Sequence, residues 1–146
     1  MTNGSAAGPG RRVLVVDDDD ALLRTVRLAL EDDGYAVDTA LSGEEALGLV
    51  KRRRPDLIML DVNMPGVDGW EVLSRLRAAA GQQTPVVVMT GGFNLQDQAL
   101  ASGAQGYLGK PFELDDLLAA VGAHVGLPMD GSHEVAPDAG VANRQM

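Results

Sequence analysis

Short apolar runs alternate with stretches of helical periodicity along most of this chain. The strand-sized runs lie near residues 13–17, 36–40, 57–61, 86–89 and 106–108. Strands that alternate with helices pair in parallel, and because their crossovers are right-handed the helices must cover both faces of the sheet. The pattern therefore predicts an α/β fold, a three-layer α/β/α sandwich around a five-stranded parallel sheet. Periodicity alone does not fix the strand order.

Two well-marked helices are expected in the first half of the chain. The first spans about 21–33 and ends at Gly34, a residue suited to a left-handed helix cap. Its predicted apolar stripe consists of Leu22, Val26, Ala29 and Leu30. The second begins with Ser42 and Glu45, which have the spacing of a capping box, and it ends before Pro55.

Three further helices are expected in the second half. The third covers about 69–80 and should bury Val72, Leu73 and Leu76. The fourth, about 95–102, is short and rich in alanine and glutamine. The fifth follows Pro111, which favours a helix start. Its predicted apolar stripe consists of Leu114, Leu117, Leu118 and Val121.

Both ends of the chain differ in composition from the middle. Residues 1–10 consist largely of Gly, Ala, Ser and Pro, and residues 127–146 mix Gly, Pro, Asp and Ser without an apolar period. Segments of this kind bury too little apolar surface to offset the entropy of ordering. We expect disorder at 1–10 and 127–146, with one folded domain over 11–126.

The composition argues against several classes of protein. The chain has no cysteine and only two histidines, which excludes disulfides, thiolate metal sites and a histidine metal cluster. Its apolar runs are too short to span a bilayer, and residues 1–12 lack the apolar core of a signal peptide. A net charge of -9 disfavours direct binding of nucleic acid. We therefore expect a cytoplasmic protein with no membrane contact.

Four of the predicted strands end in residues that can do chemistry. Asp17 and Asp18 follow the first strand, and Asp61 ends the third. Thr90 follows the fourth strand, and Lys110 follows the fifth. In an open parallel sheet ligands bind outside the carboxyl ends of the strands, so these side chains should converge on one crevice. A divalent cation bound there would relieve repulsion among the acids.

Lys110 stands out because this chain rarely uses lysine. It contains ten arginines and only two lysines. A lysine at a strand end therefore suggests a need for a compact, strongly hydrated ammonium rather than a planar guanidinium.

Four short motifs stand at these strand ends. They are VVDD at 15–18, LDVNMPGVDG at 60–69, VMT at 88–90 and GYLGKPF at 106–112. Each motif is weak alone, but in this order and spacing they closely resemble the receiver domain of two-component response regulators, over nearly all of residues 12–125. The resemblance implies the flavodoxin-like strand order 2-1-3-4-5, which brings Asp17, Asp18 and Asp61 together at the switch point.

The resemblance also implies roles for the acidic residues. Asp61 would be the phosphoacceptor, attacking a phosphoryl group on a partner's histidine to form an acyl phosphate. Asp18 and Asp61 would ligate Mg²⁺ directly, and Asp17 would act mainly through a bound water. The backbone carbonyl of Asn63 would supply another oxygen, so that the donors are the hard oxygen ligands that Mg²⁺ prefers.

Three further residues would complete the switch. The resemblance implies that Lys110 pairs with Asp61 before the reaction and with a phosphoryl oxygen after it. Thr90 would donate its hydroxyl to another phosphoryl oxygen, and Tyr107 would then rotate inward, altering the face built from the fourth helix, fifth strand and fifth helix. The family also implies that the bond between Lys110 and Pro111 is often cis.

The implied function is a phosphorylation-controlled switch that is not a turnover enzyme. Its partners would be a histidine kinase or histidine phosphotransfer protein and an unknown downstream protein, and the oligomeric state stays open. No helix-turn-helix or catalytic domain follows residue 126, so we expect a stand-alone receiver, with a truncated piece of a longer protein as the alternative. One departure concerns the 20-residue separation of Thr90 and Lys110, about two fewer than the family pattern. It falls in residues 91–102 and puts the usual interface through the fourth helix in doubt.

Alternative interpretations are weaker. A metal-dependent aspartyl phosphatase of the haloacid dehalogenase type needs a second aspartate two residues after the nucleophile, where this chain has Asn63. Helix N-capping explains Asp19 and Asp20, but Asp17 and Asp18 lie outside the predicted helix. The glycine patterns of a P-loop and of a serine hydrolase elbow are absent from the sequence. A degenerate receiver that acts only as a binding module is disfavoured because every phosphorylation residue is present.

Overall fold

A computed structural model of the chain describes residues 11–66, 68–81, 84–91, 99, 101 and 103–125. Its five strands form one parallel sheet in the order β2-β1-β3-β4-β5. The strands are β1 (Arg12–Val16), β2 (Ala36–Ala40), β3 (Leu57–Asp61), β4 (Val86–Thr90) and β5 (Gly106–Gly109). The predicted strand positions and the implied strand order are both confirmed, with shifts of one residue at some strand ends.

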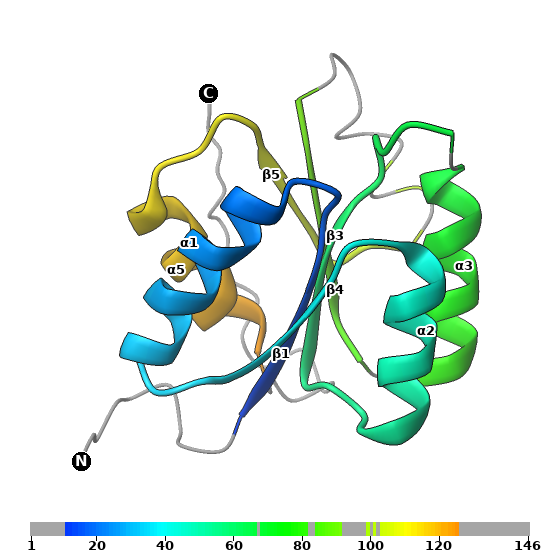
Figure 1. Ribbon diagram of the computed structural model, residues 1–146, viewed down its shortest axis with the longest axis horizontal. Coiled ribbons are helices and arrows are strands. Elements are labelled where there is room, and N and C mark those ends of the chain that lie inside the picture. The colour runs from blue at the N-terminus through cyan, green and yellow to red at the C-terminus, as the bar shows by residue number, and fades with distance from the viewer. Residues whose placement is uncertain are drawn as a thin grey trace.

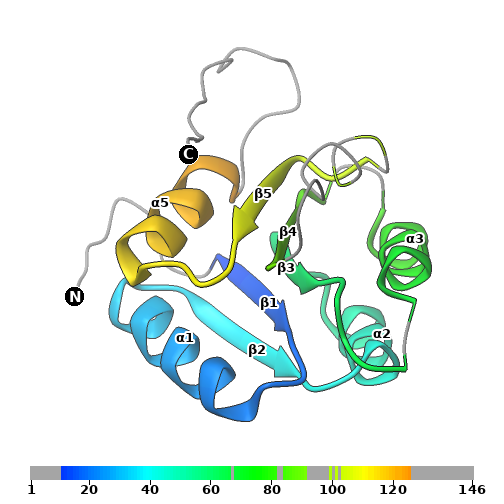
Figure 2. The same cartoon turned by 90° about the horizontal axis from the view of Figure 1, so that it is seen from above.

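Helices cover both faces of this sheet, as the sandwich prediction requires (Figures 1 and 2). The helices assigned within the described residues are α1 (Asp20–Asp32), α2 (Gly43–Arg52), α3 (Gly69–Ala80) and α5 (Leu114–His124). Figure 2 shows α1 and α5 on one side of the sheet and α2 and α3 on the other. Each side has its own core, because buried side chains alternate between the two faces along β1 and β3.

The apolar stripe of α1 differs from the prediction by one residue. Leu23, Val26 and Leu30 are the buried residues, whereas Leu22 is only partly buried. Positions 22, 26, 29 and 30 fit the helical period as well as 23, 26 and 30 do, so the packing of α1 against its neighbours decides which face is buried, and Leu22 lies at the edge of that face. Gly34 has a φ of 99° just beyond the helix, which confirms the predicted left-handed cap.

Side-chain caps fix the starts of α2 and α3. At α2 the Glu45 N–H donates to Ser42 Oγ over 3.1 Å, and the Glu45 carboxylate accepts from the Leu41 N–H over 2.9 Å. This is the predicted capping box, displaced by one residue on its return bond. At α3 the Asp68 carboxylate accepts hydrogen bonds from the Trp70 and Glu71 amides. The predicted buried positions of α3, Val72, Leu73 and Leu76, are all confirmed.

Three of the predicted segments lie wholly or mostly outside the described residues. These are most of the fourth helix, 95–102, and the terminal segments 1–10 and 127–146. In α5, Leu117 and Val121 are buried as predicted, but Leu114 is 39% exposed. Leu114 is the first residue of the helix, where it lies at the rim of the core rather than over it. Within the described chain we find no helix with the length and hydropathy of a membrane span.

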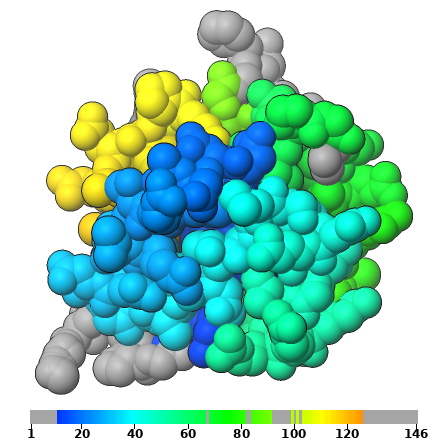
Figure 3. Space-filling model, in the orientation of Figure 1, coloured from blue at the N-terminus to red at the C-terminus, as the bar shows by residue number. Residues whose placement is uncertain are grey.

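The carboxyl ends of the central strands lie at one edge of the molecule, at the top of Figure 1. The register aligns Val16 with Leu60 and Thr90 with Gly109. The loops after β1, β3, β4 and β5 therefore start from neighbouring points. In the space-filling view the blue residues of α1 pack beside the cyan residues that follow them in the chain, and both lie on the face of the molecule that is shown (Figure 3).

Candidate functional site

Three carboxylates meet at the carboxyl ends of β1 and β3. Asp17 and Asp18 directly follow β1, and Asp61 is the last residue of β3, so the register of these paired strands places them together. One carboxylate oxygen from each lies within 4.8 Å of the other two. Asp17 and Asp61 are buried, with 0% and 3% of their surface exposed, whereas Asp18 is exposed. The predicted convergence of these acids is present in the structure.

Lys110 bridges the two buried acids. Its Nζ lies 2.6 Å from Asp17 Oδ2 and 3.0 Å from Asp61 Oδ2, and its side chain is 25% exposed. The bond to Asp61 was implied by the resemblance, but the shorter bond to Asp17 was not predicted. No sequence signal indicates this second bond, because the two residues lie 93 positions apart and meet only through the strand order. The bond between Lys110 and Pro111 is cis.

Local turns hold the second oxygen of each buried acid. Asp17 Oδ1 accepts the N–H of Asp19 over 2.9 Å, and Asp61 Oδ1 accepts the N–H of Asn63 over 2.8 Å. Each carboxylate thus points one oxygen at its own loop and the other at Lys110. Both side chains are thereby oriented before any ligand binds.

The pKa values follow from this arrangement. Burial raises the pKa of Asp61, and Asp17 adds to the effect, although the Asn63 amide and Lys110 oppose it. Burial alone would lower the pKa of Lys110, but its hydrogen bonds to Asp17 and Asp61 outweigh burial and raise it. The two carboxylates therefore stabilise the charged form of Lys110. For Asp61, the cost of burying its negative charge exceeds the stabilisation that Lys110 and the Asn63 amide provide.

Thr90 and Tyr107 lie on the adjacent strands β4 and β5. Thr90 is fully buried, and its Oγ1 has no hydrogen-bond partner within the described part of the chain. Its carbonyl oxygen accepts the Lys110 N–H over 3.0 Å and the Tyr107 hydroxyl over 3.3 Å. Tyr107 is partly buried. A buried hydroxyl without a partner is costly, so Thr90 Oγ1 is suited to a ligand.

The acidic cluster fits a hard divalent cation. All its side-chain donors are carboxylate oxygens, and its exposed member, Asp18, gives access from solvent. The carbonyl of Asn63 belongs to the loop that follows Asp61 and offers a further oxygen of the same type. The residues Asp17, Asp18 and Asp61 could therefore hold a metal ion.

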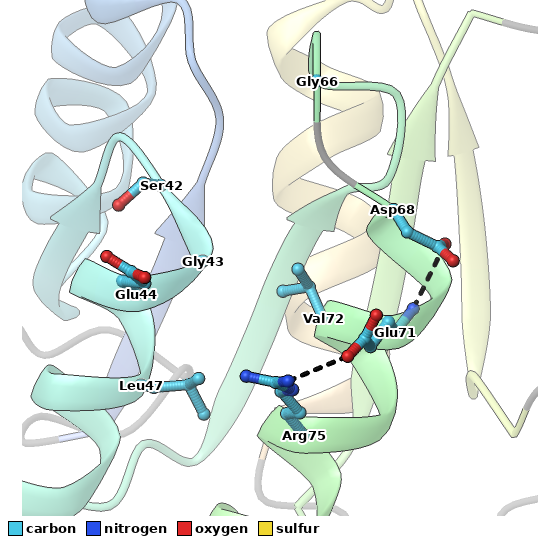
Figure 4. A pocket seen from close by; sticks show the side chains of 9 residues that line it. All are labelled: Ser42, Gly43, Glu44, Leu47, Gly66, Asp68, Glu71, Val72 and Arg75. Carbon is cyan, nitrogen blue, oxygen red and sulfur yellow. Dashed lines mark hydrogen bonds and ion pairs between the residues drawn. The ribbon is translucent and has the colours of Figure 1, made fainter.

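A second depression lies between α2 and α3, next to this edge (Figure 4). It has a volume of about 430 Å³ and a partly apolar floor that includes Leu47 and Val72. On its rim Arg75 is paired with Glu71 over 2.8 Å (Figure 4). The residues that line this cleft do not include the acidic cluster around Asp61.

This fold and acidic site define a class of signalling domain. The model of the response regulator receiver domain family matches residues 13–122, and the chain therefore belongs to this family of two-component systems. It is similar to the response regulator MprA of Mycolicibacterium vanbaalenii, with 43% identity over 129 residues that cover 86% of this chain and 55% of the relative. The chain thus spans about half the length of the curated relatives it matches.

Solved structures agree with this assignment. The chemotaxis protein CheY4 of Vibrio cholerae has a TM-score of 0.73 and 34% identity, covering 80% of this chain and 99% of CheY4. A response regulator of Burkholderia pseudomallei, solved with a phosphorylated aspartic acid, calcium ion and citrate, has a TM-score of 0.69 and 30% identity. That match covers 75% of this chain and 65% of the relative. The receiver fold implied by the motifs is thus confirmed.

Proposed function

We propose that this receiver domain accepts a phosphoryl group on Asp61 and that the modification switches a protein-interaction face. The observation that carries the proposal is the placement of Asp61 beside Asp17, Asp18 and Lys110, with a Thr90 hydroxyl on the neighbouring strand that has no partner among the described residues. The phosphorylated aspartic acid in the related Burkholderia protein supports the same chemistry here.

In the proposed reaction, a carboxylate oxygen of Asp61 attacks the phosphorus of a phosphohistidine. A phosphorus–oxygen bond forms, the phosphorus–nitrogen bond to the donor imidazole breaks, and the departing imidazole nitrogen takes a proton from water. The Asn63 amide holds Asp61 Oδ1 in place, so the carboxylate is oriented for attack. Later attack by water on the acyl phosphate would return Asp61 and release inorganic phosphate.

Mg²⁺ is the cation we propose for the acidic cluster, held by Asp18 and Asp61, by Asp17 through water, and by the Asn63 carbonyl. When bound, it neutralises the repulsion between the carboxylates and the incoming phosphoryl group. The calcium ion in the Burkholderia relative is another hard divalent cation and supports this class of ligand.

Lys110 and Thr90 would stabilise the phosphoryl oxygens. The Lys110 ammonium already lies 3.0 Å from Asp61 and would transfer its hydrogen bond to a phosphoryl oxygen. Thr90 would move its unpartnered hydroxyl toward another. Because the Tyr107 hydroxyl bonds the Thr90 carbonyl, a shift of Thr90 would change the position of Tyr107 and the face around β5.

The proposed donor is a histidine kinase or a histidine phosphotransfer protein, and the proposed target is another protein. We propose that the domain works in the cytoplasm and consumes one phosphoryl group per switching event, unlike a turnover enzyme. The matched relatives extend well beyond the receiver domain, so the response of the whole protein to phosphorylation is also part of this proposal. The disfavoured phosphatase alternative still lacks its second acid, because the residue two positions after Asp61 is Asn63.

The test is intact mass after incubation with a small-molecule phosphodonor, with Mg²⁺ or with a chelator. The proposal predicts the addition of one phosphoryl group with Mg²⁺, and little addition with the chelator or in Asp61→Asn. Equal modification of the wild type and Asp61→Asn, or none in the wild type, would refute it.

A further inference from the structure

The first residue of α3 lies directly against the backbone that follows Asp61. Gly69 is buried, and a Cβ built on it would overlap the carbonyl oxygen, Cα and carbonyl carbon of Val62, all at less than 3.0 Å. These are backbone atoms, which cannot rotate away as the end of a flexible side chain can. Any other L-residue at position 69 must therefore displace either Val62 or the start of α3.

The atoms that Gly69 touches lie between two residues of the candidate metal site. Val62 connects Asp61 to Asn63, and the Asn63 amide holds Asp61 Oδ1 over 2.8 Å. The Asn63 carbonyl is the proposed backbone ligand. At the other end of the same loop, Asp68 caps α3 through the Trp70 and Glu71 amides. The loop after the nucleophile thus closes on itself where Gly69 meets Val62.

A forced displacement would reach the loop, because α3 is anchored and cannot absorb all of it. α3 is anchored along its length by Val72, Leu73 and Leu76 in the core. Its first turn is also held from outside, because Val72 packs against Gly43 at the start of α2, where a Cβ would lie 2.9 Å from Val72 Cγ2. Val62 and Met64 are buried in the same core, so an added Cβ would strain the packing on both sides of the contact, including the backbone that joins Asp61 to Asn63.

We propose that Gly69 is a positioning residue for the metal and phosphoacceptor site. By allowing backbone contact between α3 and Val62, it sets where the Asn63 amide and carbonyl lie relative to Asp61. This inference rests on the proposed function, because it concerns how tightly the proposed Mg²⁺ site is built.

The test compares the Mg²⁺ dissociation constant of the full chain, by titration calorimetry, across three variants. Gly69→Ala should weaken Mg²⁺ binding by at least about tenfold, the lower range for loss of a group that orients metal ligands. Gly48→Ala is the matched control, since position 48 lies on α2 with no atom within 4 Å of an added Cβ. Asp68→Ala controls for the loss of helix stability, since it removes the α3 cap but leaves the contact between Gly69 and Val62. Both control variants should bind Mg²⁺ within about twofold of the wild type, well below the change expected for Gly69→Ala.

Each outcome decides the inference. Unchanged Mg²⁺ affinity in Gly69→Ala overturns it, as does an equal loss in Asp68→Ala, which would indicate general loosening of α3. Failure of Gly69→Ala to fold at low temperature, judged by circular dichroism, also overturns it, because the contact would then serve folding. Failure of the wild type itself to bind Mg²⁺ would instead count against the proposed function.

Discussion

The ammonium of Lys110 is shared by two buried carboxylates, and this sharing dominates the electrostatics at the scale of single residues. Asp17 and Asp61 each present one oxygen to Lys110 and keep the other on a backbone amide. Two negative charges against one positive charge leave the site with an excess negative charge. Such a site is prepared for a cation and carries a cost in stability without one.

Replacement of Asp61 should therefore stabilise the folded protein. Because burial raises the pKa of Asp61 above its usual 3.8, its neutral form contributes stability that is lost as the pH rises through the raised pKa. We expect Asp61→Asn to melt several degrees higher than the wild type at pH 7, because each kcal/mol added to the free energy of unfolding raises the melting temperature by roughly 4 °C. The difference should shrink as the pH is lowered through this raised pKa, because the wild-type carboxyl group is then protonated.

Thermal unfolding without divalent cations, followed by circular dichroism, checks this expectation. Asp116→Asn is the control, since Asp116 is exposed on α5 and its replacement should change the melting temperature little at either pH. A lower melting temperature for Asp61→Asn than for the wild type at pH 7 would contradict the account of the excess charge.

The size and shape of the Lys110 ammonium can be tested separately from its positive charge. Lys110→Arg keeps the positive charge but replaces a compact ammonium with a larger planar group in a space set by two bonds of 2.6 and 3.0 Å. We expect Mg²⁺ binding to persist and the rate of phosphorylation by a small-molecule donor to fall about a hundredfold, the low end of the losses measured for such donors.

Lys51→Arg is the matched control, because Lys51 is the other lysine of the chain and lies exposed on α2. Its phosphorylation rate should equal that of the wild type. A normal rate in Lys110→Arg would show that any cation at this position is sufficient.

At the scale of elements, Arg77 joins α3 to the segments that enter β4 and β5. Its guanidinium donates to the carbonyl oxygens of Thr84 and Gly103 and to the side chain of Gln105. Gln105 in turn accepts the Val86 N–H over 2.8 Å. This network lies at the amino ends of β4 and β5, away from the acidic site. It secures the entry to the strand that carries Tyr107.

Removal of Arg77 should weaken this junction. Arg77→Ala leaves carbonyl groups without their donor, and we expect a loss of about 2 kcal/mol in the free energy of unfolding, as for hydrogen bonds to a charged group. Arg75→Ala is the control on the same helix, since Arg75 makes an exposed pair with Glu71 worth less than about 1 kcal/mol. Denaturant unfolding measures both, and equal losses would show that the Arg77 network contributes nothing beyond a surface pair.

At the scale of the whole molecule, the alternation of apolar runs and helical periods was sufficient to predict the layers. A strand such as β3, buried on both faces, appears in the sequence as a continuous apolar run, and this is what a central parallel strand requires. The order of the strands is set by packing between distant segments, which periodicity does not record. The strand order was predicted only from the resemblance of the motifs to receiver domains.

The residues of the candidate site were also predictable from the sequence, but some of their contacts were not. The rule that ligands bind at the carboxyl ends of parallel strands was sufficient to bring Asp17, Asp61 and Lys110 together. The bond between Lys110 and Asp17 and the contact between Gly69 and Val62 were missed, since both depend on distances of a few ångströms between loops. The burial of Leu23 in place of Leu22 has the same origin, because the rotation of a helix is set by its neighbours.

The most direct test of the central claim is to locate the phosphoryl group within the chain. After reaction with a phosphodonor and Mg²⁺, borohydride reduces an aspartyl phosphate to homoserine, and a tryptic digest separates the candidates. Asp17 and Asp18 fall in the peptide 13–24, and Asp61 falls in the peptide 54–75, since trypsin does not cleave before Pro55. The account predicts homoserine at position 61 by fragmentation of the peptide 54–75. Homoserine at position 17 or 18, or at Asp56 or Asp68 of the same peptide, would contradict it.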